Sequence, residues 1–198
     1  MILSVLRVLV AFALACILYG DAYHSLGKLD SAEQYYRQAI ALQPQRIDAR
    51  FSLGRVLMER GQDEPKYLTE ALEAFRQMTE ENPAASEGWS NMANVLVYMN
   101  RLDDAESMYK KALEKDPRDP FLYDQMASLY VREGKLAEAE ENWKRSLAES
   151  AGYGPAVVEL AGLYGRAGRL IDVDLASVRL QRFVTRQLHR VEVGVLLS

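Results

Sequence analysis

Residues 105–117 read AESMYKKALEKDP, and this stretch carries the pattern that decides the fold. It starts with Ala105, has an aromatic residue at Tyr109 four positions later, and ends at Pro117. Its apolar residues recur at the three- and four-residue spacing of an amphipathic helix. Because proline cannot continue the helical hydrogen-bond ladder, the pattern predicts a helix that stops just before Pro117.

The same pattern occurs elsewhere in the chain. Two copies keep the alanine, the aromatic residue and the proline, and a third copy keeps only the alanine and the aromatic residue. The copies are AEQYYRQAIALQP at 32–44, ALEAFRQMTEENP at 71–83 and AEENWKRSLAES at 139–150. Recurrence at such a period predicts an array of repeated helical units.

A second helical run precedes each of these stretches. In each run a large apolar residue is followed by glycine or alanine, and the run closes with glycine or asparagine. The runs occupy 51–61, 90–100, 124–134 and 158–168. A closing glycine or asparagine suits a left-handed C-cap. We therefore expect that conformation at Gly61, Asn100, Gly134 and Gly168.

The spacing of the repeats resembles that of the tetratricopeptide repeat family, whose unit is a pair of antiparallel helices with a period of 34 residues. Pro83 and Pro117 lie 34 residues apart, and the longer interval before Pro83 places a five-residue insertion within 61–70. The small residues of the first helices (Gly20, Gly54, Ala93, Ala127, Ala161) and the aromatic residues of the second helices (Tyr36, Phe75, Tyr109, Trp143) also recur.

The resemblance spans about residues 13–177, as four good units and a degenerate fifth. In the fifth unit Val173 stands where the alanine is expected, and Ser177 stands where the aromatic residue is expected. The resemblance implies an all-α, right-handed superhelical solenoid of antiparallel helix pairs, here with an apolar N-terminal helix. Neighbouring pairs bury each other's apolar faces in such an array.

In this family the first helix of each pair lines a concave groove that binds protein partners. Carried onto this chain, the resemblance places in the groove Phe51, Arg55, Asn91, Asn94, Tyr98, Phe121, Asp124 and Arg132. Asparagine amides offer a donor and an acceptor to an extended peptide backbone, and the aromatic side chains offer apolar anchors. Some family members clamp a C-terminal carboxylate with basic residues, but Pro155 and Glu159 occupy those positions here.

Motifs for catalysis and cofactor binding are missing from the sequence. It contains no phosphate-binding loop, no nucleophile elbow, no zinc-protease motif and no pair of cysteines. One cysteine, Cys16, and two distant histidines, His24 and His189, argue against a metal site. A net charge of -4 and a pI near 5.4 argue against a nucleic-acid partner. We expect no enzyme activity, no cofactor and no bound metal.

Residues 1–19 form an apolar segment that overlaps the first helix of the first repeat, expected at 13–26. The apolar run is slightly shorter than the 20 or so residues of a typical membrane span. Four interpretations stay open: an uncleaved signal anchor, a secretory signal cleaved at the A-L-A of 13–15, a lipoprotein signal acylated at Cys16, and a helix buried against another subunit. The anchor is favoured, and Cys16 is more simply a small buried apolar residue.

By analogy with anchored repeat proteins, we expect the array on the periplasmic or extracellular side of a bacterial membrane. A secreted protein and a lipoprotein are the alternatives. At the other end, residues 178–198 are expected to form a helix that caps the array or contacts a partner. One face of this helix is a basic stripe made of Arg179, Arg182, Arg186 and Arg190.

The sequence thus predicts a non-catalytic protein–protein interaction scaffold, membrane-associated through its N-terminus, that recruits or assembles partners in a multiprotein complex. One alternative is a structural subunit that forms a homo-oligomer through its apolar ends, and a head-to-tail contact of this kind builds an open filament. A second alternative is an accessory subunit of a membrane enzyme, or of an export or cytochrome-maturation system.

Overall fold

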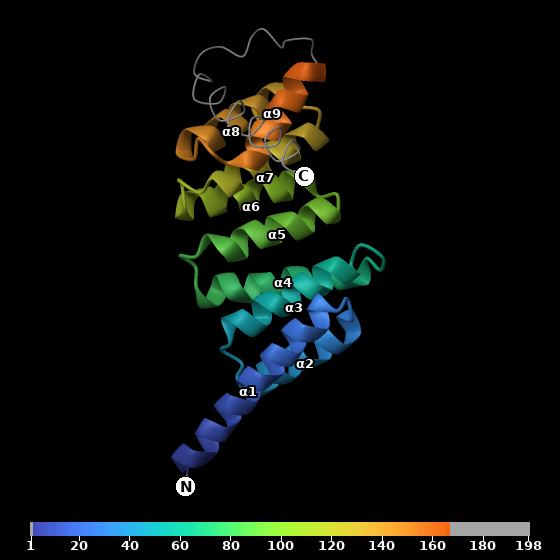
Figure 1. Cartoon of the computed structure of the whole chain (residues 1–198), viewed down its shortest axis with the longest axis vertical. Coiled ribbons are helices and arrows are strands. Elements are labelled where there is room, and N and C mark those ends of the chain that lie inside the picture. Colours follow the sequence, from blue (N-terminus) through green and yellow to red (C-terminus); the bar gives the residue numbers. More distant parts are fainter. Residues whose placement is uncertain (1, 167–198) are drawn as a thin grey trace, which may run out of the picture. The chain divides into compact units, whose positions relative to one another are not determined.

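The computed structural model describes residues 2–166, and within that range every regular element is an α-helix (Figure 1). The helices are α1 (Ile2–Ser25), α2 (Leu29–Leu42), α3 (Ile47–Arg60), α4 (Lys66–Glu81), α5 (Ser86–Tyr98), α6 (Leu102–Lys115), α7 (Pro120–Arg132), α8 (Leu136–Glu149) and α9 (Gly154–Arg166). The chain divides after Asp116 into two compact units. The all-α class that the family resemblance implies is confirmed for the described residues.

Both units are built from consecutive helix pairs. In the first unit α1 packs on α2, α3 on α4 and α5 on α6, while α2 also packs on α3 and α4 on α5. In the second unit α7 packs on α8, and α8 packs on α9. Helices α2, α3, α4 and α5 therefore bury one face within their own pair and another against a neighbouring pair, as expected for a solenoid.

The predicted helix ends agree with the positions of the prolines. Helices α2, α4 and α6 stop two residues before Pro44, Pro83 and Pro117. The residue before a proline is restricted to extended conformations, so each helix finishes one residue earlier still. Helix α8, whose copy of the pattern lacks the proline, ends at Glu149 with an extended Ser150 as its C-cap.

The recurring small residue and the recurring aromatic residue meet inside the first two pairs. A Cβ atom on Gly20 would lie 2.5 Å from the Tyr36 ring, so the ring occupies the space that a side chain would need. Ala93 and Ala127 are fully buried, like the aromatic residues of their pairs. Ala161, in α9, is exposed, and the residue that the pattern pairs with it, Ser177, lies outside the described residues.

The first helices of three pairs end in the left-handed conformation. Gly27, Asn100 and Gly134 have φ values of 69°, 57° and 76°. After Gly134 the amide of Lys135 donates to the Tyr130 carbonyl at 2.8 Å, while Gly134 itself donates to Val131 at 3.0 Å. These two bonds form a Schellman motif, and the predictions for Asn100 and Gly134 are confirmed.

The prediction of a left-handed cap at Gly61 is wrong. Gly61 has a right-handed φ of -64° because the inserted residues continue the chain through further turns before α4 begins. The amides of Asp63 and Glu64 both donate to the carbonyl of Arg60 in these turns. Glycine is required at position 61 for space, since a Cβ atom there would lie 2.3 Å from Leu68. The prediction for Gly168 falls outside the described residues.

The N-terminal apolar segment is continuous with the first repeat. Helix α1 starts at Ile2 and runs without a break to Ser25, where it is already paired with α2. In Figure 1 the dark blue N-terminal half of α1 projects past the end of α2. The expected helix at 178–198 and its arginine stripe lie outside the described residues.

Candidate partner-binding surface

Helix α3 presents Phe51 and Arg55 on the face expected to line the groove. The Phe51 ring is half-buried and meets Phe75 of α4 edge to face, with centroids 6.4 Å apart. The exposed Arg55 guanidinium lies 5.8 Å from the Phe51 centroid, within the range of a cation–π contact. The Phe51 ring therefore packs against Phe75 on one side and contacts the exposed Arg55 guanidinium on the other.

Helix α5 presents Asn91 and Asn94, and the amides of both have partners in the first unit. Asn91 donates from Nδ2 to the carbonyl of Glu87 at 2.7 Å. Asn94 accepts at Oδ1 from the Tyr109 hydroxyl at 2.5 Å. The Asn94 Oδ1 acceptor is therefore used within the helix pair. The Nδ2 group is the part of the amide that this bond leaves available to donate to a peptide.

Tyr98, at the end of α5, is 47% exposed and borders a pocket of about 460 Å³. The pocket is lined by Gly61, Gln62, Pro65, Leu68, Tyr98 and Met99. Three of these residues belong to the connection between α3 and α4, so the five-residue insertion forms one wall of the pocket. Sequence reasoning located the insertion but did not predict the pocket, because the approach of α5 to the connection depends on tertiary packing.

In the second unit, α7 presents Phe121 and Arg132 as exposed side chains, but it buries Asp124. Asp124 is 6% exposed and accepts a hydrogen bond from Trp143 Nε1 at 3.0 Å. Burial raises the pKa of Asp124, and the nearby charge of Glu159 raises it further, although the hydrogen bond from Trp143 acts in the opposite direction. The structure therefore places Asp124 inside the helix pair and away from the surface on which we expected it.

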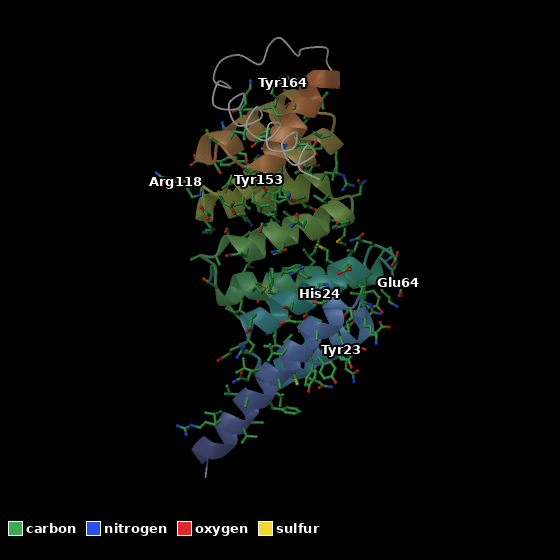
Figure 2. All side chains as sticks on the ribbon, viewed as in Figure 1. Tyr23, His24, Glu64, Arg118, Tyr153 and Tyr164 are labelled. Carbon is green, nitrogen blue, oxygen red and sulfur yellow. The ribbon has the colours of Figure 1, made fainter. Side chains whose placement is uncertain are left out.

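His24 and Glu59 connect the first two repeats. His24 Nε2 lies 2.9 Å from Glu59 Oε2, which joins the end of α1 to the end of α3. Figure 2 shows His24 near the C-terminal end of α1, with Tyr23 beside it. The sequence pattern did not reveal this contact, which joins two side chains 35 residues apart.

Comparisons with known proteins agree with this geometry. A family model described as "TPR repeat" matches residues 20–61, and a model described as "Tetratricopeptide repeat" matches residues 68–129. The chain is a tetratricopeptide-repeat protein. The search of curated proteins finds no match.

Solved structures share the fold at low sequence identity. A thermophilic tetratricopeptide-repeat protein of Thermus thermophilus is 23% identical, with a TM-score of 0.67 over 94% of this chain and 100% of that chain. MamA is 15% identical, with a TM-score of 0.67 over 87% and 96% of the two chains. PilF of Pseudomonas aeruginosa is 20% identical, with a TM-score of 0.67 over 87% and 73%.

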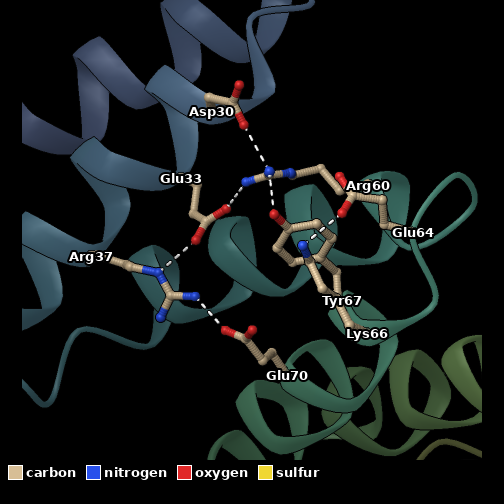
Figure 3. Close-up of polar contacts among 8 residues, drawn as sticks. All are labelled: Asp30, Glu33, Arg37, Arg60, Glu64, Lys66, Tyr67 and Glu70. Atoms are coloured by element: carbon tan, nitrogen blue, oxygen red, sulfur yellow. Dashed lines mark hydrogen bonds and ion pairs between the residues drawn. The ribbon is translucent and has the colours of Figure 1, made fainter.

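The first two repeats of this tetratricopeptide-repeat protein are joined by a second polar cluster, centred on Arg60 (Figure 3). Arg60 pairs with Asp30 at 2.7 Å and with Glu33, both on α2, and donates to the Tyr67 hydroxyl on α4 at 2.5 Å. Arg37 extends the cluster by bridging Glu33 and Glu70. These paired charges therefore connect α2 of the first repeat to α3 and α4 of the second repeat.

Cys16 and the acidic residues give no sign of a metal centre in the part of the chain that the structure describes, where no group of three or more possible ligands occurs. Cys16 is 3% exposed, belongs to the core of the first unit, and donates from Sγ to Gln38 Oε1 at 3.8 Å. This environment agrees with its interpretation as a small buried apolar residue. The tetratricopeptide fold itself supports protein–protein interaction.

Proposed function

We propose that this protein is a non-catalytic scaffold that is attached to a membrane through α1 and binds a protein partner on its helix-A face. The helix-A face of the first unit comprises the half-buried Phe51 and the exposed Arg55 and Tyr98, and the helix-A face of the second unit comprises the exposed Phe121 and Arg132. The observation that carries the proposal is the set of exposed apolar side chains on α1, namely Leu6, Val8, Leu9, Phe12, Leu14 and Leu18.

The length and composition of α1 suit a bilayer. Residues Leu6–Ser25 form a stretch of 20 residues with a mean hydropathy of 1.6, of which 17% is buried in the structure. At a rise of 1.5 Å per residue, the part of α1 that precedes Tyr19, residues 2–18, extends about 25 Å, close to the roughly 30 Å thickness of a hydrocarbon core. Signal sequences and core helices share these properties, so length and composition alone do not identify a membrane span. The distribution of the apolar side chains around the helix is the further evidence.

The exposed apolar residues of α1 are distributed around the whole helix. Successive residues of an α-helix are rotated by about 100°, so Leu14 and Leu18 lie about 120° around the helix from Val8 and Phe12, and Leu6 lies about 140° from them in the other direction. The groove of a protein partner covers one stripe of a helix, whereas lipid surrounds all of it. A helix that is apolar all round is typical of a membrane span or of a fully buried core helix.

Packing in the first repeat supports an uncleaved helix. Ala13 is fully buried, and Cys16 and Ile17 lie in the core of the first unit. Cleavage at the A-L-A of 13–15 removes Ala13 from that core, and acylation of Cys16 requires its buried sulfur to leave the core. We therefore favour the anchor over the secretory and lipoprotein alternatives, and we place the repeats on the periplasmic or extracellular side by analogy with anchored repeat proteins.

The partner-binding part of the proposal rests on exposed aromatic side chains. Tyr98 and Phe121 are large aromatic side chains, and they are 47% and 41% exposed. Aromatic residues that combine exposure with a rigid setting are typical anchors of protein interfaces. Asp124 and Tyr36, whose pKa values are raised by burial, are both engaged inside helix pairs, which supports structural roles for them.

Fractionation of cells that express the full chain tests the attachment. We expect the protein in the membrane fraction after a carbonate wash, with an N-terminal peptide that still contains residues 6–12 by mass spectrometry. Recovery from the soluble fraction contradicts attachment, and a mature chain that starts after residue 15 contradicts the anchor. Protease protection in spheroplasts reports the side, and purification in mild detergent identifies the stoichiometric partner.

A further inference from the structure

The first repeat exposes, at Tyr19, a position that the second repeat buries. Repeat register aligns Tyr19 of α1 with Leu53 of α3, and Tyr23 of α1 with Leu57 of α3. Leu53 and Leu57 are 6% and 1% exposed, and the helix they belong to packs on α2 of the preceding pair. Tyr19 is 58% exposed, because within the described residues no helix pair packs on that side of α1.

The side chains at this end of the array form an ordered aromatic surface. The rings of Tyr19 and Tyr35 stack at 5.4 Å, and those of Tyr35 and Tyr23 stack at 5.4 Å on the other side. The Lys28 ammonium lies 5.9 Å from the Tyr23 centroid. We call Tyr19, Tyr23 and Tyr35 the tyrosine face. Tyr19 is the exposed member of the face, Tyr23 and Tyr35 are half-buried, and the positions of α3 equivalent to Tyr19 and Tyr23 carry leucine.

The tyrosine face continues the apolar surface of α1. Val8, Phe12, Tyr19 and Tyr23 are spaced by four, seven and four residues, which places them on one side of the helix. Along this side the surface changes from aliphatic and phenyl groups to tyrosines, and it ends beside Lys28. Helices that enter a membrane show the same order, with aromatic residues at the lipid–water boundary and cations beyond it.

We propose that the tyrosine face lies in the headgroup layer of the membrane, so that phospholipid covers the end of the array that a preceding repeat covers elsewhere. This inference rests on the proposed attachment through α1. Tyrosine suits the position because its ring is apolar and its hydroxyl is polar, and Lys28 is placed to meet a lipid phosphate. A second copy of the chain covers one side of α1 and leaves Leu14, which lies about 150° around the helix from the middle of that side, exposed.

Depth-dependent fluorescence quenching tests the position of the tyrosine face. Three single-cysteine variants of the full chain, Leu9→Cys, Tyr19→Cys and Tyr98→Cys, are made in a Cys16→Ala background and labelled with a small fluorophore. They are reconstituted into phosphatidylcholine vesicles that contain some phosphatidylglycerol. The lipids carry bromine either high or low on the acyl chain, and circular dichroism verifies that each labelled variant is folded.

We expect shallow bromine to quench the label at position 19 most strongly, deep bromine to quench the label at position 9, and neither to quench the label at position 98. Quenching at position 9 without quenching at position 19 overturns the inference and leaves the attachment intact. Absence of quenching at both positions overturns the attachment as well. If deep bromine quenches the label at position 19 more strongly than shallow bromine does, the headgroup placement is also overturned.

A second variant avoids a label within the face. Replacing Tyr19 and Tyr35 together with serine removes aromatic area from the headgroup layer, so we expect vesicle partitioning to fall by about fivefold, since binding scales with buried apolar area. Leu136→Ser, which removes a 49% exposed apolar side chain from α8, outside the binding surface, is the control and should leave partitioning unchanged. Equal partitioning of the double variant and the control overturns the inference.

Discussion

Gly54 of α3 lies so close to Phe75 of α4 that a Cβ atom on the glycine would stand 2.6 Å from the ring. Phe75 is fully buried, so its ring has little room to move away. The same contact joins Gly20 to Tyr36 in the first pair. The pairing of a small residue with an aromatic residue therefore sets how closely the two helices of these pairs approach.

Replacing Gly54 with alanine should destabilise the protein by about 1–3 kcal/mol, because the added methyl group overpacks a filled site. Urea unfolding followed by circular dichroism measures the change. Adding Phe75→Leu to this variant should recover part of the loss, since the double change relieves the contact. Gly154→Ala, where no atom lies within 4 Å of the added Cβ, is the control. Equal effects at Gly54 and Gly154 contradict the packing argument.

The sequence predicted the helix pairs because their determinants are local. The spacing from Ala105 to Pro117 encodes both a helix and its end, and the small and aromatic positions identify which helices pair. The right-handed conformation of Gly61 could not be predicted in this way, because it depends on the inserted turns and on the approach of Leu68. The same limit applies to Asp124, whose burial depends on Trp143, 19 residues further along the chain.

The turn after α7 tests the need for a left-handed residue. Gly134 has a φ of 76°, and a Cβ atom added to it would have no neighbour within 4 Å, so backbone conformation alone constrains this position. Gly134→Ala should cost about 1–2 kcal/mol of unfolding free energy, the penalty of a left-handed conformation for an ordinary residue. Gly134→Asn should cost less, since Asn100 already adopts this conformation in the preceding repeat. Identical costs for the two variants, measured by urea unfolding, exclude the conformational explanation.

The buried carboxyl of Asp124 should give a stability difference that depends on pH. Burial raises the pKa of the Asp124 carboxyl in the folded state. The folded protein therefore keeps the carboxyl proton to a higher pH than the unfolded chain, in which an aspartate has a pKa of about 3.9. The contribution of Asp124 to stability is therefore greatest below that pH and declines as the pH rises through the folded pKa. Asp124→Asn keeps an acceptor for Trp143 but does not titrate.

The unfolding free energy of the wild type relative to Asp124→Asn should therefore decrease as the pH rises from acid to neutral. Asp124→Ala leaves the indole N–H of Trp143 without an acceptor and should be less stable than Asp124→Asn by about 1–3 kcal/mol at any pH. Urea titrations at a series of pH values measure all three proteins. A difference between wild type and the asparagine variant that stays constant with pH contradicts a displaced titration at Asp124.

Tyr98 and Phe121 test the helix-A face, once co-purification has identified the partner. Each alanine substitution should weaken partner binding by about 1–3 kcal/mol, because an exposed aromatic anchor loses the surface that it buries on binding. Stability should change little, since the two side chains are 47% and 41% exposed. Leu136→Ala is the matched control: Leu136 is 49% exposed and lies at the start of α8, a helix outside the helix-A face. Tyr98→Phe separates the ring from the hydroxyl at the rim of the pocket, and isothermal titration calorimetry gives the affinities. If all four variants bind like the wild type, the partner uses another surface.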